Sequence, residues 1–389
     1  MIRNIIGSIK ERGRDFYNNR RVINKFPSRI DPPLGNALLI YITYPFFLKK
    51  NSQEYRSHIN IRNSHTIVRA FNELGFNVDI INHEDGKYDT NKKYDMVIGV
   101  GQALDRDKNY LKNSKVKIYY ATGLHWLTES YLIFQRYLYL KNRKGTSLIP
   151  QRLNKPYLSA EKSDIIFSVQ NNYTNETYAH LKKPIVYIAP TGSFDTGPQQ
   201  ESIKNKNSKK ILWLSGVGMV LKGLDLVLEA FSELPAIELM ICADFSTEPG
   251  FADVYSNELN QKNIQYLGFV DIGSEKFKSV TDQCIGVIYP YPEGEISGSI
   301  INAMYFGLIP IIAYCSNAEI SNFAVPTCPS VLEIKKSLEI ISSMSDSEIR
   351  ERSEKCLKYI YEYHSPQKEA DDWRSAIQFV IDQYLLNKK

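Results

Sequence analysis

The chain has 389 residues, of which 43% are hydrophobic and 23% are charged. This length suits two α/β domains of roughly 150–200 residues each, and the composition excludes a disordered or fibrous chain. The net charge of +5 is confined to residues 1–36, which carry eight basic and three acidic side chains. The neutral remainder argues against a nucleic-acid-binding face on the folded domains.

Targeting and redox features predict a cytoplasmic protein. No apolar run approaches the ~18 residues that a membrane span needs, and we expect no secretory signal because Ile alternates with Arg and Lys at the N-terminus. The five cysteines include no Cys-x-x-Cys pair, which argues against a disulfide framework and a zinc site. Ile2, Ile5, Ile6 and Ile9 recur at helical spacing, so residues 1–30 could lie on the inner membrane surface or pack on their own domain.

Residues 37–190 predict a first doubly wound, Rossmann-like domain. A buried strand is expected at Ala37–Thr43, a helix at 60–74 that ends at Gly75, and a strand at Val78–Ile81. Four further β-branched runs are typical of parallel strands that are covered on both faces. They are Met96–Val100, Lys117–Ala121, Ile165–Val169 and Ile185–Ala189.

Residues 191–209 are rich in Gly, Gln, Lys, Asn and Ser, and predict a linker between domains. A second α/β series then predicts another domain over 210–365, with a final amphipathic helix in the segment 366–389. Its predicted strands are Ile211–Ser215, Glu238–Cys242, Ile264–Leu267, Ile285–Tyr289 and Ile309–Ala313, and its predicted helices are Leu224–Leu234 and Gly298–Phe306. Two such α/β halves place a ligand cleft at the carboxyl ends of their strands.

The first loop of the second domain has features of a phosphate site. Gly216 and Gly218 follow a predicted strand, and Lys222 stands just before a predicted helix. Glycines let backbone approach an anion closely, and a lysine at a helix N-terminus supplies countercharge. Alternatively, the loop is an ordinary glycine-containing turn between a strand and a helix, and its lysine is only solvated.

A second loop gives a stronger indication. Ser297 and Ser299 are good N-cap residues, and Gly298 leaves backbone N–H groups open at the positive end of a helix, where a diphosphate could bind. Glu293 and Glu295 lie just upstream and are candidate catalytic residues that would contact sugar hydroxyls or steady positive charge at the anomeric carbon. Alternatively, the loop is only polar and its glutamates cap the helix.

The stretch Lys209–Tyr314 resembles the donor-binding domain of the retaining GT-B fold glycosyltransferases known as group 1 or family four. The resemblance covers about a quarter of the chain and rests on four segments in family-like order. They read ILWLSGVGMVLKGLDLVLEAF, IELMICADFSTEPGFADVY, NIQYLGFVD and CIGVIYPYPEGEISGSIINAMYFGLIPII. The resemblance implies a GT-B fold in which two Rossmann-like domains face a central cleft and the C-terminal helix returns to the first domain.

The resemblance also implies residue roles in donor binding. Lys222 would bind the diphosphate, the backbone around Tyr266 and Phe269 would border the nucleobase, and Glu293 or Glu295 would stand for the first glutamate of the family's Glu-x7-Glu motif. The phosphates would lie at Ser297, Gly298 and Ser299, beside the loop of Gly216 and Gly218.

Two positions depart from the family pattern. The second glutamate of that motif, which holds the ribose, is replaced by Asn302, and Val217 occupies the usual place of a second basic residue. Asparagine can still hydrogen-bond a ribose, more weakly than a carboxylate does. These departures put the donor's identity and full activity in doubt.

In the first domain, His125 follows a predicted strand and is a candidate catalytic residue, because family members often place a histidine near the donor sugar there. It could equally anchor a packed loop. Asp105 and Asp107 form an Asp-x-Asp pair in the wrong context for the metal motif of another glycosyltransferase fold. We therefore expect no essential metal and no cofactor.

The sequence thus predicts a metal-independent glycosyltransferase. It would move a sugar from a nucleoside diphosphate-sugar to a saccharide or lipid-linked acceptor in surface polysaccharide or glycan synthesis. The alternatives are a GT-B sugar-nucleotide epimerase or hydrolase, and a non-catalytic glycosyltransferase-like subunit.

Overall fold

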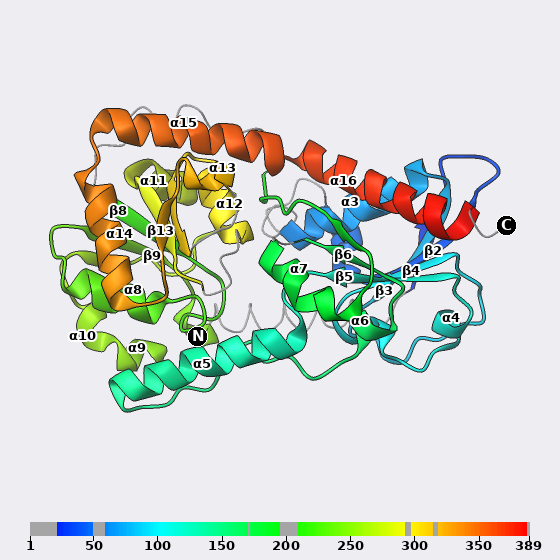
Figure 1. Cartoon of the computed structure of the whole chain (residues 1–389), viewed down its shortest axis with the longest axis horizontal. Helices are drawn as coiled ribbons and strands as arrows, with labels where there is room; N and C mark the ends of the chain where they lie inside the picture. Colours follow the sequence, from blue (N-terminus) through cyan, green and yellow to red (C-terminus); the bar gives the residue numbers. More distant parts are fainter. Residues whose placement is uncertain are drawn as a thin grey trace. The chain divides into compact units, whose positions relative to one another are not determined.

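The computed structural model describes residues 22–49, 59–169, 172–194, 209–291, 297–313 and 318–386 of the chain. They form two compact α/β units (Figure 1), and the chain passes between these units several times. The first unit contains the described parts of Met1–His125, Pro156–Ala189 and Gln367–Lys389. The second contains those of Trp126–Lys155 and Pro190–Pro366.

The first unit is built on a seven-stranded sheet of order β1-β3-β2-β4-β5-β6-β7. All neighbouring strands are parallel except β1, which runs antiparallel to β3 at the edge. The strands are β1 (Ile23–Phe26), β2 (Gly35–Tyr41), β3 (Phe76–Asn82), β4 (Met96–Gly99), β5 (Val116–Ala121), β6 (Ile165–Ser168) and β7 (Ile185–Tyr187). Apolar side chains fill both faces, as the continuous β-branched runs predict.

Helices cover this sheet, and the last helix of the chain is one of them. Trp373 and Ile377 of α16 are fully buried in the same core as strand residues of β2 and β5, which confirms the predicted return of the C-terminal helix to the first domain. The helical elements are η1 (Tyr44–Phe47), α3 (Ile59–Glu73), η2 (Gly101–Leu104), α4 (Asn109–Lys112), α6 (Ser159–Lys162), α7 (Asn172–Tyr178), η3 (Ala179–Leu181), α16 (Pro366–Val380) and η6 (Ile381–Leu386).

The second unit has a six-stranded sheet of order β10-β9-β8-β11-β12-β13, with every pair parallel. Its strands are β8 (Lys210–Leu214), β9 (Glu238–Cys242), β10 (Ile264–Tyr266), β11 (Gly286–Tyr289), β12 (Ile309–Ala313) and β13 (Val325–Thr327). Its helical elements are α5 (Trp126–Lys144), α8 (Leu224–Ser232), η5 (Phe245–Thr247), α9 (Phe251–Val254), α10 (Ser256–Leu259), α11 (Glu275–Gln283), α12 (Gly298–Met304), α13 (Ala318–Ser321), α14 (Val331–Ser343) and α15 (Asp346–Tyr363).

Helix α5 comes from the first half of the sequence but packs on the second unit (Figure 1), whereas the predicted division assigned its residues to the first domain. Arg136 donates a 2.7 Å hydrogen bond to the fully buried Asp225 of α8, and Arg143 forms ion pairs with Asp225 and Glu229. A buried carboxylate requires such partners. Helix α5 therefore supplies the positive charges that the carboxylates of α8 need.

Two parts of the basic N-terminal segment, residues 1–36, have different outcomes. The amphipathic repeat of Ile2, Ile5, Ile6 and Ile9 lies outside the described residues. Residues 23–26 form the edge strand β1, whose Ile23 is buried in the core of the first unit. Among the helices that the structure describes, none has both the length and the apolar character to cross a membrane.

Candidate functional site

The order of the second sheet reverses between β8 and β11, which lie side by side in parallel register. In doubly wound sheets, ligands bind beyond the carboxyl ends of the strands at such a switch point. The loop after β8 carries Gly216, Gly218 and Lys222, and the loop after β11 leads to Ser297 and α12. The topology therefore places the two predicted phosphate loops side by side at the carboxyl ends of β8 and β11.

The β8–α8 loop is tightly folded and in contact with the end of β11. Gly223 has a φ of +79°, and a Cβ there would lie 2.5 Å from Cγ of Pro290, so only glycine fits. Gly218 also has a positive φ, of +85°, while Gly216 faces open space. The carbonyl of Gly218 accepts a 2.9 Å hydrogen bond from the backbone N–H of Lys222.

Lys222 is a buried cation in this loop, with only 9% of its surface exposed. Its ammonium group donates a 2.6 Å hydrogen bond to Oγ of Ser215 at the end of β8. No carboxylate among the described residues forms an ion pair with it. A buried charge is normally paired with an opposite charge, and the described residues around Lys222 give it a hydroxyl partner but no ion-pair partner.

The electrostatic surroundings agree with this reading. The pKa of Lys222 is lowered to about 7, mainly by burial and then by the nearby charge of Arg152, against the opposing charge of Glu248. Glu248 is itself buried, and its two oxygens accept 2.5 Å hydrogen bonds from the Tyr137 hydroxyl and from the backbone N–H of Met219. An anion beside Lys222 would favour the charged ammonium form.

Residues 292–296 of the second loop, which include the candidates Glu293 and Glu295, lie outside the described residues. Ser297 is the N-cap of α12, yet its side chain makes no capping hydrogen bond. Its Oγ is buried without a hydrogen-bond partner among the described residues. Gly298 and Ser299 form the first turn of the helix, as predicted.

Two exposed aromatic residues stand at the carboxyl end of β10, Tyr266 as its last residue and Phe269 just beyond it. Tyr266 is 44% exposed, and its ring stacks on Phe245 at a centroid distance of 4.1 Å. Its hydroxyl donates to the carbonyl of Ala243. Phe269 is 67% exposed. A flat, supported aromatic surface can hold a planar ring by stacking, which fits the position predicted for a nucleobase.

Asn302 of α12 is buried and hydrogen-bonded within the second unit. Its Oδ1 accepts a 2.6 Å hydrogen bond from the backbone N–H of Ser193, and its Nδ2 donates to the Ser193 hydroxyl over 3.4 Å. A Cβ on Gly192 would lie 2.7 Å from this Oδ1. The structure thus gives Asn302 a role in fixing the start of the predicted linker against α12.

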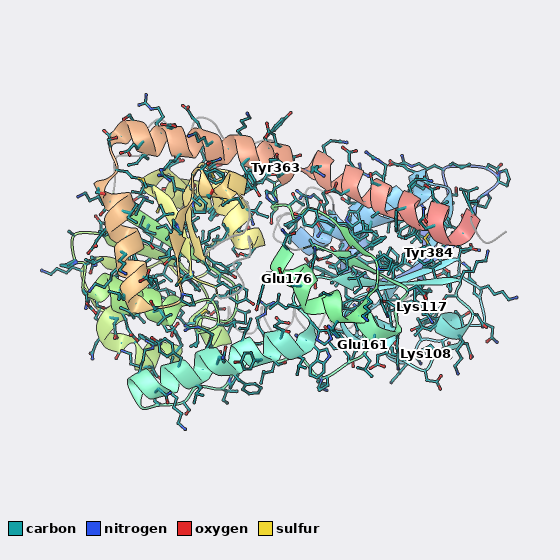
Figure 2. All side chains as sticks on the ribbon, viewed as in Figure 1. Lys108, Lys117, Glu161, Glu176, Tyr363 and Tyr384 are labelled. Carbon is teal, nitrogen blue, oxygen red and sulfur yellow. The ribbon has the colours of Figure 1, made fainter. Side chains whose placement is uncertain are left out.

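His125 lies at the end of the first segment of the first unit and is only 5% exposed. Its Nε2 is 3.1 Å from Oε1 of Glu161 on α6, which Figure 2 labels, and its backbone N–H donates to Oγ1 of Thr177. Its ring makes edge contacts with Tyr178 and His180. These contacts fit the alternative of a packed loop anchor.

Metal-ligating groupings are few in the described parts of the chain. The ligand atoms of His125, Glu161 and His180 lie within 4.8 Å of one another, and the His125–Glu161 hydrogen bond accounts for part of this grouping. Asp105 is bound by Lys162 and by the backbone N–H of Leu158. Its motif partner Asp107 pairs with Lys112 at 2.6 Å, so the two carboxylates have separate partners.

The sequence interpretation missed several residues that shape the loop around Lys222. Tyr137 and Arg152 are distant from it in sequence and reach it because α5 packs on the second unit, whereas Glu248 reaches it from the end of η5 within that unit. Local periodicity and spacing carry no signal for such contacts. A buried glutamate with hydrogen bonds to both oxygens is found only in the folded structure.

Comparison with protein-family models and with curated protein sequences gave no match. Solved structures do match by fold. A glycosyltransferase from Rickettsia africae matches over 91% of this chain and 99% of its own, with a TM-score of 0.54 and 14% identity. HepE of Anabaena in complex with UDP-glucose matches over 89% and 100%, with a TM-score of 0.56 and 11% identity. The chain spans 54% of TarM, at a TM-score of 0.49.

These likenesses establish the fold: the chain has the two-domain, Rossmann-like architecture of GT-B glycosyltransferases. At such low identity they do not transfer activity or residue roles, because one fold supports many functions.

Proposed function

We propose that this protein is a glycosyltransferase that uses a nucleoside diphosphate-sugar donor, with retention at the anomeric carbon. The observation that carries the proposal is the buried ammonium group of Lys222, which has a serine hydroxyl but no paired carboxylate among the described residues. It stands at the switch point of a GT-B fold, beside a glycine loop and a helix N-terminus. A diphosphate would supply the missing negative charge.

In this proposal the sugar–diphosphate bond breaks, the acceptor oxygen bonds the anomeric carbon, and the acceptor hydroxyl gives its proton to the departing diphosphate oxygen. Lys222 and the first turn of α12 at Ser297–Ser299 stabilise the departing diphosphate, where negative charge develops. Tyr266 and Phe269 border the nucleobase. Glu293 or Glu295 faces the donor sugar.

The acceptor class is a saccharide or a lipid-linked saccharide of surface polysaccharide or glycan synthesis. HepE was crystallised with UDP-glucose, which makes a uridine diphosphate donor the first to test. We propose a cytoplasmic enzyme that needs neither metal nor cofactor, with the basic segment that precedes β1 in contact with the inner membrane surface. The basic charge of residues 1–36 supports that contact with anionic lipid.

The direct test is a thermal-shift screen of the full chain against UDP, GDP, ADP, TDP and their glucose derivatives. A ligand at 100 times its Kd stabilises the folded state by about 2.7 kcal/mol, so one nucleotide class is expected to raise Tm by several degrees. No shift with any of them would contradict the donor site. Inorganic phosphate at equal ionic strength is the control for nonspecific anion binding.

Product analysis separates the proposal from its enzymatic alternative. A transferase consumes the best-binding sugar nucleotide only when an acceptor is added, whereas an epimerase or hydrolase consumes it alone. The hydrogen bonds that hold Asn302 against Ser193 favour one further reading, a non-catalytic glycosyltransferase-like subunit. That reading predicts that the protein binds the nucleotide but turns over no sugar nucleotide under either condition.

A further inference from the structure

Position 217, where the resemblance leads us to expect a second cation, is occupied by Val217, which is 37% exposed. The folded chain brings another cation to the same loop. Arg152 follows α5, and its Cδ lies 3.6 Å from the point that a Cβ on Gly218 would occupy. The aliphatic part of Arg152 therefore runs along the glycine loop itself, one residue from Val217.

We propose that Arg152 is the second cation of the phosphate-binding site and replaces in space the basic residue that is absent at position 217. This inference rests on the proposed function, since it assigns a further residue to the same donor site. It is carried by the position of Arg152 beside Gly218, by its backbone conformation and by the buried network that holds its segment in place.

Hydrogen bonds through buried groups hold the Arg152 segment against the loop. The backbone N–H of Gln151 donates over 3.0 Å to the Tyr137 hydroxyl, which donates to Glu248. The other oxygen of Glu248 accepts from the backbone N–H of Met219, the residue after Gly218. Because Tyr137 and Glu248 are both buried, this connection fixes the two segments relative to each other.

The backbone of Arg152 is held in an unfavourable conformation. Its φ is +64°, in the left-handed region that non-glycine residues seldom adopt. Such strain persists where surrounding structure imposes it, and often at functional sites. A glycine would adopt this φ without strain, yet the chain has an arginine, whose guanidinium can bind phosphate through two parallel hydrogen bonds.

The charge arrangement is consistent with an anion between the two residues. Arg152 is close enough to Lys222 to lower its pKa, so two positive groups converge on one loop. Arg152 also favours the charged form of Glu129, whose pKa is raised chiefly by burial. A purely structural Arg152 would act on neighbours such as Glu129, and this alternative is separable by experiment.

The test measures, by calorimetry, the binding of UDP and of uridine to the full chain and to three variants. If the thermal-shift screen favours another nucleotide, that nucleoside diphosphate and its nucleoside replace UDP and uridine. We expect Arg152→Ala to weaken UDP binding about 10- to 100-fold, the size of a lost charge-assisted contact, and to leave uridine binding unchanged. Lys155→Ala removes an exposed cation from the same segment and should change neither. Adding Val217→Arg to Arg152→Ala returns a cation to the loop and should restore most of the affinity.

The outcomes distinguish this inference from the function on which it rests. If the unmodified protein binds no nucleotide diphosphate, the proposed function fails. If it binds UDP and Arg152→Ala binds equally well, Arg152 is not part of the site. Equal weakening of UDP and uridine, with no rescue by Val217→Arg, would assign Arg152 a structural role through Glu129 and overturn the inference.

Discussion

A buried lysine with no carboxylate partner among the described residues makes ligand binding and protein stability respond to pH in opposite directions. The folded pKa of Lys222, about 7, lies well below the ordinary lysine value of 10.5. Between these values the unfolded chain holds a proton that the folded protein has lost. Stability therefore rises with pH in this window, while the charged form needed to bind a diphosphate becomes scarce.

We expect UDP affinity to fall by up to about tenfold as pH rises from 7.5 to 8.5, where the diphosphate is fully ionised and the uracil ring stays neutral. Lys222→Met should bind about 10- to 100-fold more weakly at pH 7.5 and lose this dependence. Calorimetry in two buffers of different ionisation enthalpy should show proton uptake on binding to the unmodified protein only. The exposed Lys278→Met is the control, and a slope that survives in Lys222→Met would contradict the assignment.

Asn302 also acts at the scale of single residues. Its Oδ1 accepts the Ser193 N–H at 2.6 Å in a buried setting. We predict that Asn302→Ala lowers the free energy of unfolding by about 1–3 kcal/mol, the cost of leaving a buried donor unsatisfied. Ser193→Ala removes only the 3.4 Å contact and should change little. Urea denaturation measures the free energy of unfolding of both variants. Equal losses of stability in Asn302→Ala and Ser193→Ala would rule out the structural role of the Asn302 Oδ1.

Between elements, the packing of α16 on α3 involves a buried ion pair. Glu369 is 2% exposed, and its Oε2 lies 3.6 Å from the Arg62 guanidinium. The pKa of Glu369 is raised to about 7, mainly by burial, with Arg62 opposing the rise. From pH 4.5 to about 7, the folded state binds the proton that the unfolded chain has released, so stability falls as pH rises through this range.

We therefore expect Glu369→Gln to gain stability relative to the unmodified protein between pH 5 and pH 8, by about 2–3 kcal/mol. Arg62→Met should extend the loss of stability to higher pH, because Arg62 holds the pKa of Glu369 down. Urea midpoints measured at half-unit pH steps give both comparisons. Parallel pH profiles for the unmodified protein and Glu369→Gln would show that this carboxyl does not titrate as described.

Across the whole molecule, neither half of the sequence encodes a complete unit. The first unit needs α16 from the C-terminus, and the second needs α5 from the first half. Trp373 of α16 is fully buried in the first core, where it makes edge contacts with the rings of Tyr120 and Phe167.

Trp373→Ala is expected to destabilise the first unit by about 3–5 kcal/mol, the usual cost of removing a buried tryptophan. Hydrogen exchange should show faster exchange in β2 and β5 and unchanged protection in β8 and β11, because these strands belong to the second unit. Phe379→Ala, on the same helix but 38% exposed, should leave both sets unchanged. Uniform loss of protection in all four strands would show that the units unfold together.

The sequence alone predicted the fold class and the strands β2–β12, because each of these strands carries its own hydrophobic pattern. Strands β9 and β12 have the predicted bounds, the other predicted strands differ by a few residues, and the short strands β1 and β13 were not predicted. Helix α5 was not predicted as an element, because apolar residues such as Leu127, Tyr131 and Phe134 are exposed on its outer face and obscure its period.

Only the tertiary structure decided which unit α5 joins and which residues surround Lys222. The pairing of Arg136 with Asp225 and the position of Arg152 beside Gly218 connect residues far apart in the chain. The spacing of residues along the chain does not predict such contacts, because they form between segments that only the packed sheets and helices bring together. Buried charges in these segments must then be paired. The sequence by itself predicted a phosphate loop with one cation, and the fold brought a second cation to it.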